Sequence, residues 1–210
     1  MANKSLKSAK LNHEKEQKLV ARRFRDRNRK FLRLPINEQR IKIIKDVITR
    51  LETEKMVAKN NRFLRVIGIR RRVYRNENLH ELLEQNKCEV CGIGGVFTAA
   101  VLLKNKIKVG NLFRNIYVTP TLLMNYFRHG HVAGSDMVIY LRKWFTRTQL
   151  ELIEAAFEVS LNYANGTFDT SAKTAVEFGR KYTSAKSRLL AICKNMLENN
   201  GKFVPKQMVF

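Results

Sequence analysis

The chain has 210 residues, and its hydrophobic content of 44% suits one domain with its own core. Its 41 Lys and Arg residues exceed its 18 Asp and Glu residues, and the net charge of +23 predicts attraction to a polyanion: nucleic acid, a ribonucleoprotein, an acidic protein or an anionic membrane surface. No apolar run of about 18 residues occurs, which argues against a membrane span. The start lacks the apolar core of a secretory signal, and three cysteines suit a reducing cytosol better than a disulfide framework.

Residues 1–34 form a strongly basic segment that holds 12 Lys and Arg against three acids. Apolar residues are sparse in it, although the absence of Gly and Pro from 11 to 32 is compatible with a helix. We interpret it as a basic N-terminal arm that becomes ordered mainly on binding. The alternative is a solvated helix packed along the body of the protein.

Pro35 marks the start of the globular domain, which we assign to residues 35–210, because the residue before a proline is pushed out of helical geometry. Asn37 is then expected to cap a helix. Apolar side chains follow at helical spacing and predict that helix over residues 38–53. They are Ile41, Ile44, Val47, Ile48 and Leu51.

The segment FLRVIGIRRRVYR (63–75) is rich in β-branched and aromatic residues and predicts a strand pair or an extended segment. It is also the densest cationic patch outside the arm, with no acid among its arginines. We call residues 62–75 the Arg-rich segment. Its arginines are Arg62, Arg65, Arg70, Arg71, Arg72 and Arg75.

The next part of the chain has helical patterns. Asn78 is expected to cap a short turn that runs through Leu83. The nearly continuous apolar or small residues of 89–104 predict a buried helix. Pro120 follows Thr119 and predicts the first turn of a further helix.

Two later helices have recognisable ends. Thr146 and Gln149 match a capping box, and Asn165-Gly166 is expected to end the helix that they open. Ser184 or Ser187 is expected to start the last helix, which Gly201 ends. The expected fold class is therefore mainly α: a compact helical domain with a minor β hairpin or extended segment near 62–75 and a basic N-terminal arm.

Four segments occur in a recognisable order: DVITRLETEKM (46–56), CEVCGIGGVF (88–97), WFTRTQLELIEAAFE (144–158) and RLLAICKNMLENNGKFVP (188–205). They resemble a group of small bacteriophage proteins with the patterns DVLxxL, CxVCxxGxxF, QLxLIExAFE and RLxxIxxNIxxNxGxFxP. The resemblance implies a phage protein in the host bacterial cytoplasm during infection, or in the virion. No activity attaches to the group, so the resemblance implies no catalytic residues. The basic arm and the Arg-rich segment depart from the pattern.

Cys88 and Cys91 have the spacing of zinc ligands, and His129 and His131 are candidates to complete a Cys₂His₂ site. One such cysteine pair is a weak signal by itself. The residues GIGGVFTAAVLL that follow are typical of a helix interior, and free cysteine is commonly buried. We therefore favour two small buried residues over a zinc site or a redox-active dithiol, and we expect no cofactor.

Other catalytic patterns are weak. GIGG lacks the spacing and the ending of a phosphate-binding loop, and no convincing strand precedes it. Glu151, Glu154 and Glu158 share one face of a predicted helix and would suit a metal, but exposed helix charge is the usual explanation for this spacing. The four histidines have no recognisable Ser or Asp partner pattern. We therefore expect no enzymatic activity.

The cationic segments give the clearest functional prediction, because phosphate contacts need positive donors spread over a surface rather than a short motif. Tyr74 can stack on an unpaired base, although packing within the fold is the commoner role. No signature of a sequence-specific binding domain occurs, so we expect backbone contacts that weaken with salt. The candidate nucleic-acid-binding residues are Arg22, Arg23, Arg25, Arg27, Arg29, Lys30, Arg62, Arg65, Arg70, Arg71, Arg72, Tyr74 and Arg75.

Three hypotheses about function follow from these patterns. The first is a non-enzymatic bacteriophage accessory protein that binds RNA, DNA or a ribosome through the arm and the Arg-rich segment. The second is an anti-defence inhibitor that occupies an acidic, nucleic-acid-like surface of a host defence protein. The third is a virion component whose arm contacts packaged DNA.

Overall fold

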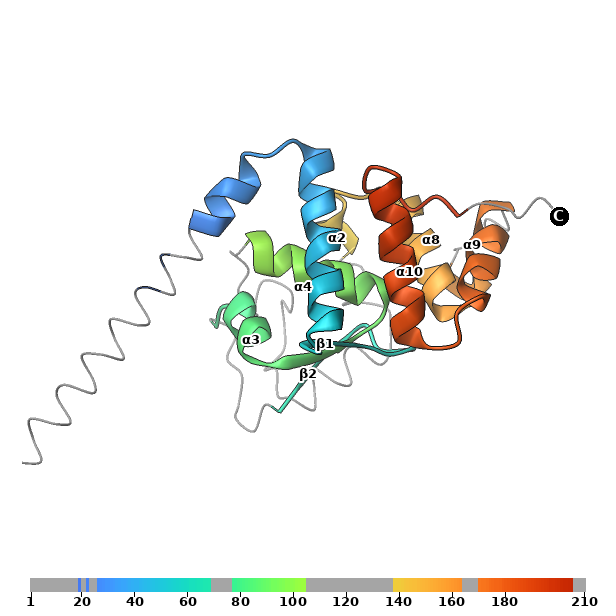
Figure 1. Cartoon of the computed structure of the whole chain (residues 1–210), viewed down its shortest axis with the longest axis horizontal. Coiled ribbons are helices and arrows are strands. Elements are labelled where there is room, and N and C mark those ends of the chain that lie inside the picture. The colour runs from blue at the N-terminus through green and yellow to red at the C-terminus, as the bar shows by residue number, and fades with distance from the viewer. Residues whose placement is uncertain are drawn as a thin grey trace, which may run out of the picture.

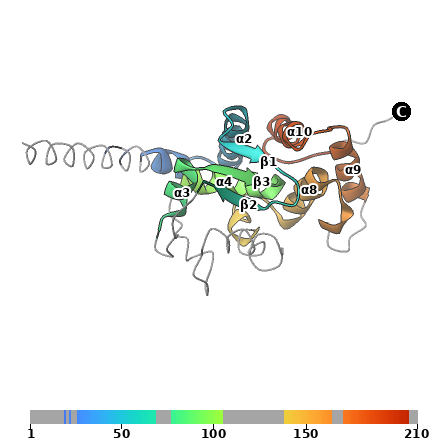
Figure 2. The same ribbon diagram turned by 90° about the horizontal axis from the view of Figure 1, so that it is seen from below.

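The computed structural model describes residues 19, 22, 26–68, 77–104, 138–163 and 170–205. It is mainly helical with a small three-stranded mixed sheet, as the sequence predicted. Figures 1 and 2 show α4 in the middle of the molecule. Helix α2 packs on α4, α10 packs on α2, and α8 contacts both α4 and α10 while α9 packs on α8. None of the described helices is long and apolar enough to cross a membrane.

Helix α2 spans Ile36–Glu52 and confirms the helix expected from 38 to 53. Its N-cap is Pro35, so the expectation that Asn37 caps it is wrong. The side chain of Gln39 instead fixes the start of α2. Its Nε2 donates to Leu34 O at 2.6 Å, and its Oε1 accepts the indole N–H of buried Trp144 at 2.8 Å.

The sheet has the strand order β1-β3-β2, formed by Met56–Ala58, Lys87–Val90 and Leu64–Ile67 respectively. Strands β1 and β3 are parallel, and β2 and β3 are antiparallel. The extended segment expected near 62–75 is thus confirmed over 64–67, but its partner lies more than twenty residues downstream rather than in the same segment. Residues 69–76 lie outside the described part of the chain.

Helix α3 (Leu79–Gln85) begins after Asn78, as expected, but the Asn78 side chain makes no capping bond to its backbone. The helix leads into β3. The helix expected over 89–104 begins only at Gly92, because Glu89 and Val90 belong to β3. Alternation explains the strand: Cys88 and Val90 are buried, whereas Lys87 is exposed and Glu89 half-buried. Helix α4 (Gly92–Lys104) is then buried at all but its last residue.

Two glycines allow the backbone of other elements to touch α4 and α9. A Cβ on Gly94 would lie 1.5 Å from the carbonyl oxygen of Phe63, and one on Gly179 would lie 1.9 Å from that of Ala156. The small residue Gly94 at the start of α4 therefore permits close approach of the chain just before β2.

Helix α8 (Arg147–Glu158) has Thr146 as its N-cap, with Oγ1 accepting the Gln149 N–H at 3.2 Å. Half of the expected capping box is confirmed, because the side chain of Gln149 bonds instead to both backbone groups of Phe203. The helix ends at Val159, whose φ of 56° is left-handed, and not at Asn165-Gly166, which lies outside the described residues. A 3-10 turn, Leu161–Tyr163, follows.

Helix α9 (Thr170–Arg180), which the sequence patterns did not predict, leads to α10 (Ala185–Glu198). Ser184 and Ser187 form the capping box of α10, and Gly201 has the left-handed φ of +80° expected where that helix ends. Phe203 then folds back into the core.

Candidate functional site

The described end of the basic arm packs on the body. Residues 26–32 are helical, and Phe31 is buried beside Trp144, with ring centroids 6.1 Å apart. The Nη2 of Arg27 donates to the carbonyl oxygen of Leu102 at the end of α4, at 3.2 Å. Residues 26–32 therefore follow the alternative of a helix packed along the body, which presents Arg29 and Lys30 to solvent.

Among the other candidate cations of the arm, Arg22 is exposed. Arg23 and Arg25 lie outside the described residues, as do Arg70, Arg71, Arg72, Tyr74 and Arg75 of the Arg-rich segment. The helix expected at Pro120 and the candidate ligands His129 and His131 also lie outside them.

Arg62 and Arg65, the described members of the Arg-rich segment, gather with Lys59 around Glu89 on β3. The carboxylate lies 3.8 Å from Arg62 Nε, 3.3 Å from Arg65 Nη1 and 3.3 Å from Lys59 Nζ. Arg65 faces Glu89 directly across the antiparallel pair. Three cations share one acid, so this Glu89 cluster keeps a net positive charge, and Arg62 and Arg65 remain 25% and 34% exposed.

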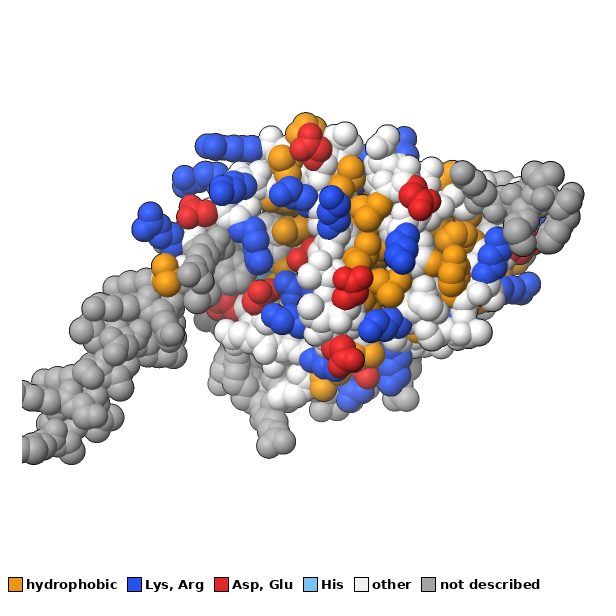
Figure 3. Space-filling view, in the orientation of Figure 1, with side chains coloured by type: hydrophobic (Ala, Val, Ile, Leu, Met, Phe, Trp, Pro, Cys, Tyr) orange, Lys and Arg blue, Asp and Glu red, His pale blue; other side chains and the backbone are white. Residues whose placement is uncertain are grey.

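Exposed cations beyond those that sequence reasoning singled out lie on the helices and in the turns next to them. No ion pair with an acid of the described chain is formed by exposed Arg29, Lys30, Arg33, Lys42, Lys45, Lys55, Arg142, Lys173, Arg180, Lys181, Lys186, Lys194 or Lys202. Figure 3 shows Lys and Arg side chains spread over the face formed by α2, α10 and α9, with Asp and Glu side chains interspersed among them. The available signal was the presence of lysine on the polar sides of α2, α9 and α10.

Cys88 and Cys91 are both buried, one on β3 and one between β3 and α4. Burial raises the pKa of the Cys88 thiol to about 12 and that of Cys91 well above its usual value, so neither is a thiolate at neutral pH. Their burial agrees with the interpretation of two small core residues. The group of possible metal ligands found among the described residues contains Cys91 without Cys88.

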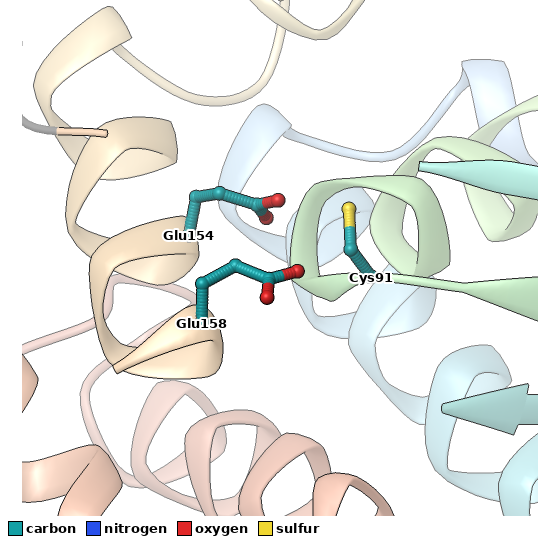
Figure 4. A group of neighbouring side chains, drawn as sticks. All are labelled: Cys91, Glu154 and Glu158. Atoms are coloured by element: carbon teal, nitrogen blue, oxygen red, sulfur yellow. The ribbon is translucent and has the colours of Figure 1, made fainter. Parts of the chain in front are cut away.

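That group joins Cys91 to Glu154 and Glu158 of α8, with ligand atoms within 4.8 Å of one another (Figure 4). Glu154 is only 6% exposed, so the interpretation of exposed helix charge is wrong for it. Its Oε2 accepts the backbone N–H of Ile93 at 3.0 Å, and the Cys91 thiol, 3.9 Å from the Phe63 carbonyl oxygen, lies within 4.8 Å of the same carboxyl. Burial raises the pKa of Glu154 to about 7. The sequence signal was the apolar run on both sides of this acid.

The other two acids of α8 have ordinary structural partners. Glu158 accepts the Asn61 N–H at 2.9 Å and the Asn60 amide at 3.1 Å, which holds the turn between β1 and β2. Burial raises its pKa. Glu151 pairs with Arg147 at 2.7 Å on the surface of the helix. The carboxylates of Glu154 and Glu158 therefore act on the backbone of two neighbouring segments.

The start of α4 also corrects the view of GIGG. A strand does precede it, contrary to expectation, so the order of elements resembles that of a phosphate-binding loop. Its first amides are already bonded within the protein, Ile93 N to Glu154 and Gly94 N to Cys91 Sγ at 3.4 Å. A buried carboxyl thus takes the position that a phosphate would need.

No protein-family model, curated protein or solved structure matches this chain. The resemblance to bacteriophage proteins stays a prediction from its four motifs.

Proposed function

We propose that this protein is a non-enzymatic bacteriophage accessory protein that binds nucleic acid or a nucleoprotein through its basic arm and the Arg-rich segment. What carries the proposal is the set of exposed cations that form no ion pair with an acid of the described residues, on a chain whose net charge is +23. Phosphates replace the missing acids, and the release of counterions from the nucleic acid makes such contacts favourable.

The Glu89 cluster supports the proposal by its geometry. Its one carboxylate orients Arg62 and Arg65 on the sheet while leaving their charge mostly uncompensated. Arginine presents several donors in a planar fork, which suits phosphate oxygens. Arg29 and Lys30 extend the positive surface from a helical segment that Phe31 anchors in the core.

The test uses the full chain, because Phe31 is part of the core and a deletion through residue 34 would damage the fold. Affinities for labelled RNA and DNA are measured over a series of salt concentrations. We expect Arg29→Glu with Lys30→Glu to weaken binding and to lower the slope of log K against log salt by about two units. The matched control, Lys55→Glu with Lys173→Glu, makes the same charge change elsewhere and should have a smaller effect.

Binding that is insensitive to salt, or absent at low salt, contradicts the proposal. Capture from infected cells with and without nuclease separates the alternatives. A host protein retained after nuclease and high salt supports the anti-defence inhibitor, and recovery from purified particles supports the virion component. Loss of all partners after nuclease supports the leading proposal.

A further inference from the structure

A groove lies between α9 and α10, and it differs in chemistry from the cationic segments described above. Its walls are formed by Phe178, Tyr182, Ser187, Leu190, Ala191, Lys194, Asn195 and Glu198. The α10 members follow one another at helical spacing and form one continuous stripe along that helix. Figure 3 shows hydrophobic side chains between α10 and α9, with Lys or Arg on both sides.

The aromatic end of the groove is held in place by the fold. Phe178 lies 5.5 Å from Tyr182 and 5.2 Å from Phe203, centroid to centroid, and is nearly perpendicular to the latter. Phe203 is buried, and Gln149 bonds to both its backbone N–H and its carbonyl. The carbonyl of Tyr182 accepts from Arg188 Nη2 at 3.2 Å. The ring of Tyr182 is thus half-buried on a supported backbone.

Exposed lysines lie on α10, the helix that forms one wall of the groove. Lys194 lines the groove, and Lys186 precedes it by eight residues on the same helix, which places the two about 12 Å apart along the axis. Exposed Lys181 and Lys202 are next in sequence to Tyr182 and Phe203. Glu198, at the far end of the stripe, is the acid among the lining residues.

We propose that this groove binds a single-stranded segment of nucleic acid, with a base stacked on Tyr182 and phosphates at Lys186 and Lys194. Stacking platforms beside a positively charged track are the common arrangement for unpaired strands, because every base has a π-face. The exposed lysines Lys186 and Lys194, about 12 Å apart along α10, favour this occupant over an amphipathic peptide, which needs no cation at either position. The inference rests on the proposed binding of nucleic acid and adds a second site to it.

The experiment measures fluorescence anisotropy of the full-length protein with a labelled single strand of about 12 nucleotides and with a duplex of the same sequence. Tyr182→Leu removes the ring, and Tyr182→Phe keeps it. We expect Tyr182→Leu to lower single-strand affinity by about fivefold or more and to leave duplex affinity unchanged. Tyr182→Phe should retain the affinity of the parent for both. A strand with abasic sites should not distinguish Tyr182→Leu from the parent.

The lysines are tested with a matched pair on another helix. Lys186→Ala with Lys194→Ala should weaken single-strand binding more than Lys42→Ala with Lys45→Ala, which removes the same charge from exposed positions of α2. Equal losses for the two pairs, or an unchanged single-strand affinity for Tyr182→Leu, overturn the groove while leaving the proposed function intact. Failure of the parent to bind any nucleic acid overturns both. If the groove variants lose binding to an acidic amphipathic peptide but still bind the strand, the groove belongs to a protein partner instead.

Discussion

The carboxylate of Glu154 on α8 accepts the backbone N–H of Ile93 in the first turn of α4, with 3.0 Å between Oε2 and N. This bond joins the central helix to a helix more than sixty residues downstream. Both partners are buried. A carboxyl at this place satisfies an orphan amide of the helix start, but its charge is costly away from water.

Glu154 predicts a pH dependence of stability. Its pKa rises from 4.5 to about 7 in the folded chain, chiefly by burial, so the folded state holds the proton more tightly. The stronger proton binding adds on the order of 3 kcal/mol to the free energy of unfolding. This stabilisation is complete below pH 4.5 and is lost as the pH rises to about 7. Urea unfolding across this range should show the decline. Glu154→Gln should flatten it, whereas Glu151→Gln on the same helix should not; equal slopes for the two variants contradict the assignment.

Gly94 predicts a severe effect of one methyl group. In Gly94→Ala the new Cβ would meet the Phe63 carbonyl oxygen at 1.5 Å, so the backbone must move, at a cost of about 3 kcal/mol or more. Gly95→Ala is the matched control, because its nearest neighbours are side-chain atoms at 3.3 Å and beyond. Its stability should stay within about 1 kcal/mol of the parent. Thermal unfolding measures both, and similar melting temperatures would refute the close approach.

The three cysteines are free and buried, and burial raises the pKa of each thiol. We therefore expect a thiol reagent at neutral pH to label none of them quickly in the folded protein and all three after unfolding. The measurement is the rate of labelling with and without denaturant. Rapid labelling of Cys91 in the folded state would contradict its burial. If the unfolded protein is labelled only after a chelator is added, the thiols instead hold a bound metal.

Glu89 predicts opposite changes in stability and binding. Glu89→Gln removes the one carboxylate shared by Lys59, Arg62 and Arg65, so the repulsion among them should destabilise the fold by about 1 kcal/mol. Nucleic-acid affinity should rise several-fold at low salt, because phosphates no longer compete with that acid. Glu52→Gln, at an exposed position of α2, is the control for net charge. A weaker affinity for Glu89→Gln than for the control excludes this cluster from the interface.

Local signals made the ends of some helices predictable. Ser184, Ser187 and Gly201 act within one turn of α10, so their roles depend little on the rest of the fold. The end of α8 was not predictable in the same way. Val159 adopts a left-handed φ there although β-branched residues rarely do, because the packing of α8 and α9 decides where the chain turns.

The residues of the candidate sites also fall into those that local sequence predicts and those that depend on tertiary contacts. Positive charge is visible in composition, and exposed Arg29 and Lys30 needed no structure to be suspected. The apolar residues on both sides of Glu154 were a weaker signal than the helical spacing that places it on one face with Glu151 and Glu158, and only the contact with α4 separates them. The Tyr182 groove escaped notice because its walls come from two helices, of which α9 was not predicted.

The strand order has a consequence for the order of events during folding. The central strand β3 comes last in the chain, so β1 and β2 have no native partner until residues 87–90 exist. No hairpin of the two earlier strands can serve as a template, and loop closure must precede any pairing. Lys59, Arg62 and Arg65 also leave the ribosome before the one acid that neutralises them. During synthesis, this stretch of the nascent chain is therefore an unpaired, positively charged segment in contact with the RNA of the ribosome.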